Sequence, residues 1–91
     1  MEQEKEPLMT VENLKKASEG ALLRFAMLLY ELDHPRESVT KAFCEITGIT
    51  QPTLNQAIAG RGSIGGENWL KIQKAIGRSL YESWLKAKNN P

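Results

Sequence analysis

A single segment, TKAFCEITGITQPTLNQAIAG at 40–60, most constrains what this chain can fold into. Its first part carries apolar residues at the three- and four-residue spacing of one helix face, namely Ala42, Phe43 and Ile46. Gly48 follows, and a glycine can end a helix in the left-handed conformation without the steric cost of a Cβ atom. The pattern therefore predicts a helix that stops at a tight turn.

A second helix is predicted directly after that turn. Thr50 is a favourable N-cap, and Pro52 falls in the first turn, where its missing N–H would lack a helical partner in any case. The inward positions are apolar and comprise Leu54, Ala57 and Ile58. The other positions are polar and include Gln51, Thr53, Asn55 and Gln56. Two short helices joined by a turn of about four residues that contains a glycine form a helix-turn-helix pattern.

Parts of the chain resemble the Cro and phage-repressor type of helix-turn-helix protein, the XRE-like regulators. GITQPTLNQAIAG at 48–60 is similar to the turn and recognition helix of that family. WLKIQKAIG at 69–77 resembles the family's next helix, and RSLYESWL at 78–85 resembles the start of its last helix. The resemblance implies an all-α, five-helix, lambda-repressor-like bundle whose recognition helix enters the major groove of DNA.

The rest of the chain fits one small all-α domain. Strand patterns are nearly absent, 3.6-residue periodicities dominate, and 91 residues allow a single domain. We expect residues 1–9 to form a disordered acidic tail, residues 10–88 to form one helix-turn-helix DNA-binding domain, and residues 89–91 to fray. No apolar run approaches the ~20 residues of a membrane span. The polar start does not resemble a signal peptide, and one cysteine forms no internal disulfide, so we expect a cytoplasmic protein.

The net charge of +1 hides an uneven distribution. Residues 1–37 carry eight acidic and five basic side chains, whereas residues 38–91 carry three acidic and seven basic ones. The basic part contains the helix-turn-helix pattern, and a positive local field favours a polyanionic partner. A small imbalance of this kind also arises by chance, so charge alone does not choose the partner.

The N-terminal part predicts a long apolar helix. Thr10 and Ser18 are both suitable N-caps, and Gly20 weakens helical continuity, so the helix can break or kink there. From 21 to 32 the sequence ALLRFAMLLYEL is apolar almost all round, with Arg24 and Glu31 as its charged residues. Such a helix is either buried in the core or offers a second face to a partner, as in a homodimer.

Two further helices are predicted toward the C-terminus. Gly65 or Gly66 begins the first of them, and Gly77 ends it. Ser79 and Glu82 have the spacing of a capping box for the last helix.

The side-chain inventory does not support an enzyme. His34 is the only histidine and Cys44 the only cysteine, so the chain lacks a metal-ligand set and a nucleophilic pair. The glycine-rich stretch RGSIGGEN at 61–68 lacks the P-loop spacing and follows no predicted strand. We therefore expect no catalytic residue, no metal, no cofactor and no small-molecule substrate.

A DNA-reading surface, in contrast, has the residue types it requires. Glutamine and asparagine suit bidentate hydrogen bonds to adenine, whereas cations and small polar groups suit phosphates. We expect base-reading positions at Gln51, Pro52, Thr53, Asn55 and Gln56. We expect contacts to the DNA backbone from Thr40, Lys41, Thr50, Arg61, Ser63 and Lys71. In the family the loop at 61–68 runs near the DNA backbone, while the alternative is a plain flexible connector. Pro52 stands where the family often has a polar contact residue, so that contact is lost or becomes apolar, for instance to a thymine methyl group.

The sequence predicts a sequence-specific DNA-binding transcriptional regulator, repressor-like and homodimeric, that reads double-stranded DNA with the helix at 51–59. Its two half-sites would lie ~34 Å apart. The candidate dimer contacts are Leu28, Tyr81 and Trp84, although Trp84 suits the core equally well. The alternative is a helical protein–protein interaction module, antitoxin-like or an adaptor, that uses the same fold without binding DNA. RNA binding is less well supported, because Trp69 and Trp84 lie on apolar faces and form no stacking platform.

Overall fold

A computed structural model describes residues 11–89, which form six helices and contain no strand. The helices are α1 (Val11–Lys16), α2 (Glu19–Asp33), α3 (Val39–Thr47), α4 (Gln51–Ile58), α5 (Gly66–Ile76) and α6 (Leu80–Lys88). The all-α prediction is confirmed, but the expected count of five helices is wrong. The N-terminal stretch forms two helices because the chain breaks at Ala17 and Ser18 and starts again as α2. The predicted tail at 1–9, the Thr10 cap and the last two frayed residues lie outside the described residues.

The break between α1 and α2 lies at Ser18, and Gly20 has a different role from the one predicted. The Ser18 hydroxyl accepts the Ala21 N–H at 3.1 Å, which makes Ser18 the N-cap of α2. Gly20 then continues α2 without interruption and is buried. A Cβ atom at this position would lie 2.5 Å from the Ile58 carbonyl oxygen and 3.0 Å from that of Ala57. A glycine is therefore required here because the end of α4 approaches the backbone of α2 closely.

The predicted turn between α3 and α4 is confirmed in detail. Ser38 is the N-cap of α3, and its hydroxyl accepts the Lys41 N–H at 3.4 Å. Gly48 ends α3 with a φ of 79°, in the left-handed region. Thr50 is the N-cap of α4 and accepts the Thr53 N–H at 3.4 Å. Each boundary is set by a residue directly beside it in the sequence, which is why the local sequence identifies it.

The start of α6 is capped by a residue that the sequence pattern does not indicate. The predicted capping box is wrong, because Ser79 forms no side-chain hydrogen bond at the N-terminus of α6. Instead the buried Gln73 of α5 accepts the Glu82 backbone N–H at 2.9 Å through its Oε1 atom, and its Nε2 atom donates to the Glu82 carboxylate at 3.4 Å. An orphan N–H of α6 is thus satisfied from the neighbouring helix.

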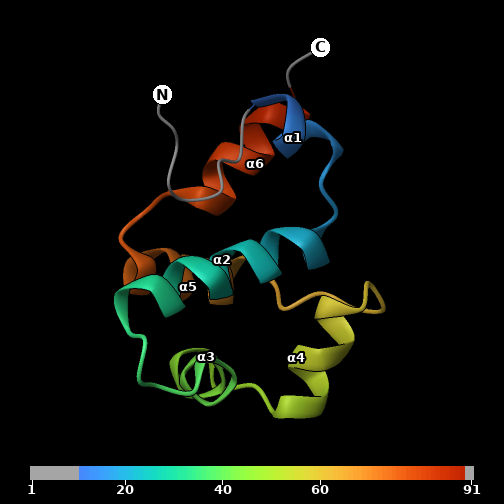
Figure 1. Cartoon of the computed structure of the whole chain (residues 1–91). Coiled ribbons are helices and arrows are strands. Elements are labelled where there is room, and N and C mark those ends of the chain that lie inside the picture. Colours follow the sequence, from blue (N-terminus) through green and yellow to red (C-terminus); the bar gives the residue numbers. More distant parts are fainter. Residues whose placement is uncertain (1–10, 90–91) are drawn as a thin grey trace.

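The helices are arranged in three tiers (Figure 1). α1 and α6 pack together at one end, α2 and α5 cross the middle, and α3 and α4 form the other end. The middle helices contact both outer tiers, so the main core lies around them. Its largest fully buried side chains are Leu22, Leu23, Phe43, Leu54, Trp69 and Ile72. Burial of each aliphatic or phenylalanine side chain contributes ~1.5–3 kcal/mol, and this holds α3 and α4 against the middle tier.

No helix within 11–89 combines the length and the apolar composition that crossing a bilayer requires.

Candidate nucleic-acid interface

α4 has one buried side and one exposed polar side. Leu54 and Ala57 are 0% and 1% exposed, and Ile58 is half-buried against the core. All five residues predicted to read bases are exposed on this helix: Gln51, Pro52, Thr53, Asn55 and Gln56. An α-helix with its side chains is ~10–12 Å in diameter, and the DNA major groove, which is ~12 Å wide, admits one. Shape and chemistry therefore allow this face to lie in such a groove.

The C-terminal end of α4 is fixed to α2. Gly20 lets the two backbones approach, and the Arg24 guanidinium Nη1 donates to the Ile58 carbonyl at 3.5 Å. A cation at this end of a helix also interacts favourably with the helix dipole. The N-terminal end begins at the exposed Thr50, whose hydroxyl lies 3.0 Å from that of Thr53. The contacts of its C-terminal end with α2 thus hold the polar face of α4 in a defined orientation.

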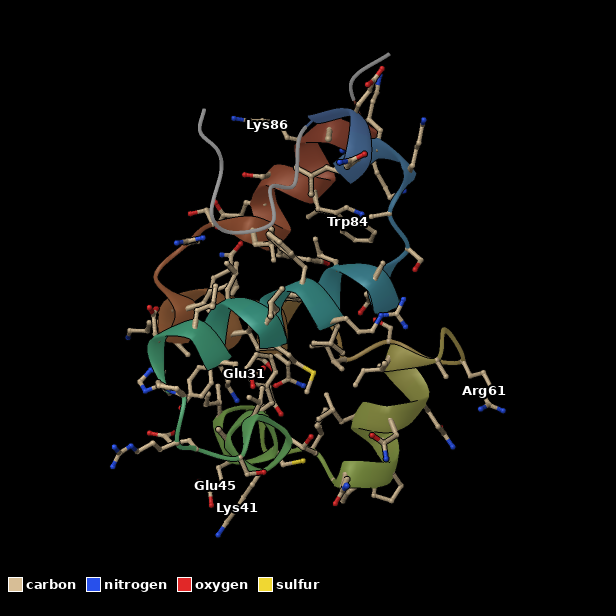
Figure 2. All side chains as sticks on the ribbon, viewed as in Figure 1. Glu31, Lys41, Glu45, Arg61, Trp84 and Lys86 are labelled. Carbon is tan, nitrogen blue, oxygen red and sulfur yellow. The ribbon has the colours of Figure 1, made fainter. Side chains whose placement is uncertain are left out.

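The cation at the start of α3 is surrounded by acidic side chains. Lys41 is exposed and shares a shallow groove of about 280 Å³ with Glu37 and Glu45. Glu37 accepts the Tyr30 hydroxyl hydrogen at 2.7 Å, and its second oxygen lies 3.4 Å from His34 Nδ1. Figure 2 shows Lys41 beside Glu45 at the end of the molecule formed by α3 and α4. Two carboxylates next to one ammonium leave little net attraction for a phosphate at this point.

The loop at 59–65 is attached to α2 through one carboxylate. Glu19 Oε2 accepts hydrogen bonds from the Ser63 hydroxyl at 2.9 Å, the Ile64 N–H at 3.2 Å and the indole N–H of Trp69 at 3.0 Å. The Ser63 oxygen in turn accepts the Gly65 N–H at 3.1 Å. A phosphate contact by Ser63 would have to replace its bond to Glu19, and a phosphate there would approach a carboxylate. The network therefore favours an ordered connector in this part of the loop.

Arg61 is the best placed of the predicted phosphate contacts. Arg61 is exposed just after α4, where its own N–H donates to the Gln56 carbonyl at 2.8 Å. In Figure 2, α4 lies between the labelled Lys41 and Arg61. Lys71 is exposed on α5, and Thr40 is half-buried in the first turn of α3. The structure thus brings α4, Arg61 and the start of α3 to one end, with Lys71 on the middle tier.

The three candidate dimer residues occupy different surroundings. Leu28 is 37% exposed on α2. Tyr81 is half-buried, and its ring stacks on Trp69 with centroids 5.2 Å apart. Trp84 is half-buried between α6 and α1, where its indole N–H donates to the Ala17 carbonyl at 3.0 Å. Leu28 is therefore the member of this set with a free apolar surface, while the two aromatic rings pack within the chain.

The described residues contain no group of three or more histidine, cysteine, aspartate or glutamate side chains that could hold a metal ion.

Comparisons of this chain with family models, with curated proteins and with solved structures give no match. The resemblance to phage repressors accordingly stays a prediction.

Sequence reasoning missed two polar residues that connect separate elements, namely Glu19, which holds the loop after α4, and Gln73, which caps α6. Neither Glu19 nor Gln73 is among the candidate site residues predicted from the sequence. Their partners lie 44–50 residues away for Glu19 and nine residues away for Gln73. No local signal in the sequence indicates such pairings.

Proposed function

We propose that this chain is a sequence-specific DNA-binding regulator, repressor-like, in which α3 and α4 form a helix-turn-helix and α4 enters the major groove. One observation carries the proposal: α4 exposes three planar amides, Gln51, Asn55 and Gln56, while its opposite side is buried and its C-terminal end is anchored.

The amides define what kind of site α4 would read. Glutamine and asparagine pair with the N6 and N7 atoms of adenine in the major groove, and each good bidentate pair discriminates by ~1–3 kcal/mol. Pro52 is exposed in the first turn and has no N–H to donate, so it suits an apolar contact with a thymine methyl group. We therefore expect an operator whose half-sites are rich in A·T pairs.

The charge around α4 predicts weak binding to random DNA. α4 itself contains no charged residue, and Lys41 is offset by Glu37 and Glu45. Arg61 and Lys71 remain as the main phosphate contacts. Each neutralised phosphate contributes about −0.9 to the slope of log K against log salt. Two to three contacts per copy thus give a slope of roughly −2 to −3, and base readout must supply much of the affinity.

Control of transcription by a chain of this size fits a homodimer on a two-fold symmetric site. Each copy would place its α4 in one major groove, with half-site centres ~34 Å apart.

The first experiment is amide chemical-shift mapping of the labelled chain with a random-sequence duplex at low salt. Shifts confined to 50–63 and the start of α5 would support the proposal, and an operator can then be selected from a random library. An absence of shifts at every duplex concentration would refute it.

Three alanine variants then separate base readout from backbone contact. Gln56→Ala should lose ~1–3 kcal/mol on the selected operator and little on random DNA. Arg61→Ala should weaken binding to both and lower the salt slope by about one. Lys86→Ala, at the opposite end of the molecule in Figure 2, is the matched control and should change neither. Equal losses on both DNAs for Gln56→Ala and Arg61→Ala would contradict the assigned roles.

The second candidate function is a helical interaction module without DNA binding. It is favoured by four large apolar side chains exposed within 11–89: Leu28, Leu32, Leu70 and Leu85, at 37–54%. Such a module would not be retained on heparin or DNA at low salt.

A further inference from the structure

An apolar groove runs beside α2. It has a volume of about 390 Å³ and is lined by Arg24, Met27, Leu28, Glu31, Val39 and Ile58. α2 forms one wall, the start of α3 and the end of α4 form the others, and Figure 2 shows Glu31 between α2 and α3. Leu32 continues the same face one turn later and is 54% exposed. Four of the six residues that line this groove are apolar, and none of the six is among the predicted DNA contacts.

The charges along this face are arranged symmetrically about the apolar residues. Arg24 lies three residues before Met27, and Glu31 lies three residues after Leu28. Both charged side chains are exposed. Arg24 and Glu31 are seven positions apart, ~10 Å along the helix, beyond the three- and four-residue spacing at which side chains of one helix pair.

We propose that this groove binds a second copy of the same chain, with the two α2 helices antiparallel and a two-fold axis between Met27 and Leu28. In this register Arg24 lies opposite the partner's Glu31, and Glu31 opposite the partner's Arg24. Met27 of each copy packs on the partner's Leu28. An isologous interface requires a surface that is complementary to itself under reversal, and the order Arg24, Met27, Leu28, Glu31 meets this requirement.

A second copy fits better than an unrelated partner because one antiparallel register of the two α2 helices matches both the opposite charges and the apolar side chains. α5 carries the same spacing of opposite charges at Glu67 and Lys74, around the exposed Leu70. There, however, the antiparallel register would place Leu70 against the partner's Lys71. The charge spacing alone is therefore not distinctive, and α5 supplies a control.

This pairing adds an interface to the homodimer of the proposed function. It rests on that proposal only where the dimer binds DNA. Ile58, at the end of α4, lines the groove, so the pairing would fix how the two α4 helices are placed relative to one another. The contact itself is measured without DNA, so failure of the pairing and failure of DNA binding are distinguishable. A single pair of crossed helices covers less than the ~1,600 Å² of a standard interface, and we expect a weak dimer with a Kd on the order of 10–100 μM.

The test is sedimentation equilibrium of the full chain. Arg24→Glu and Glu31→Arg should each weaken the dimer at least tenfold, since each places like charges opposite one another at two positions. An equimolar mixture of the two variants should associate as tightly as the wild type, because both opposite-charge pairs form again in the mixed dimer. The double variant Arg24→Glu, Glu31→Arg should also dimerise, and the α5 variants Glu67→Arg and Lys74→Glu should leave the Kd unchanged.

Restored association in the mixture cannot come from a variant that fails to fold, which matters because Arg24 also contacts Ile58. Circular dichroism of each single variant provides the additional check. A wild-type chain that stays monomeric at millimolar concentration would overturn the inference. So would a mixture of folded variants that remains monomeric, or a Kd that responds equally to the α5 variants.

Discussion

Replacement of Gly20 by alanine tests how α4 is held. The added Cβ atom would lie 2.5 Å from the Ile58 carbonyl oxygen, whereas ordinary contacts begin at 3.4 Å. The backbones of α2 and α4 would have to separate by about 0.9 Å, because neither obstacle is a flexible side chain. Overpacking of this kind costs ~1–3 kcal/mol. The higher helix propensity of alanine stabilises the helix by up to ~1 kcal/mol, and by less at a position so close to the helix N-terminus.

We therefore expect Gly20→Ala to lower the free energy of unfolding by ~1–2 kcal/mol, because the packing cost exceeds the gain in propensity. Urea unfolding would show a lower midpoint at unchanged m-value, and thermal unfolding a Tm lower by roughly 4–16 °C. Gly62→Ala is the matched control, since a Cβ atom there would meet nothing within 4 Å and the backbone needs no positive φ. It should be neutral or stabilise by up to ~1 kcal/mol.

Gly20→Ala also tests whether the position of α4 affects DNA binding. A displaced C-terminal end of α4 would tilt the exposed amides, so Gly20→Ala should lose operator affinity beyond any loss on random DNA. Equal or greater stability than the wild type would refute the close-approach argument.

Two further perturbations test the polar contacts. Glu19→Gln should destabilise by ~1–3 kcal/mol in urea unfolding, because an uncharged amide cannot accept all three hydrogen bonds as strongly. Glu67→Gln removes an exposed carboxylate from the first turn of α5 and should change the stability by no more than ~0.5 kcal/mol. Equal losses for the two variants would contradict the network. The pKa of Tyr30 is raised above 10.0, first by its hydrogen bond to Glu37 and then by burial and the charges of Glu37 and Glu45. Folding thus favours the protonated phenol. The stability that results from the raised pKa of Tyr30 is present below pH 10 and is lost as the pH rises through that pKa. Tyr30→Phe should show a smaller alkaline loss of stability than the wild type in unfolding measured from pH 8 to 11, and an identical pH dependence of the two chains would reject the contact.

The sequence identified most helix boundaries because their signals are local. Ser18 and Thr50 cap the helices that follow them, and Gly48 and Gly77 end helices with φ values of 79° and 71°. The inward face of α4 was also predicted, since the spacing of its apolar residues determines which side can be buried. The exposure of its polar residues follows from the same spacing.

Local reasoning failed where a distant residue takes over a local role. Ser79 and Glu82 have the spacing of a capping box, but Gln73 reaches the α6 N-terminus from a buried position and accepts the Glu82 N–H instead. Gly20 looks like a helix breaker in isolation. In the fold it is the point at which α4 crosses α2, and the cost of glycine is offset by that close contact.

The sequence by itself determined that this chain is helical, where most of its helices begin and end, and which side of α4 is polar. These properties depend on residues within a few positions of one another, so the chain order contains them. Only the tertiary structure decided that α1 covers α6 and Trp84, that Glu19 fastens the loop after α4, and that Leu28 remains uncovered between Arg24 and Glu31. Each of these depends on which helices meet, and side chains tens of residues apart acquire their roles only when packing brings them within contact distance.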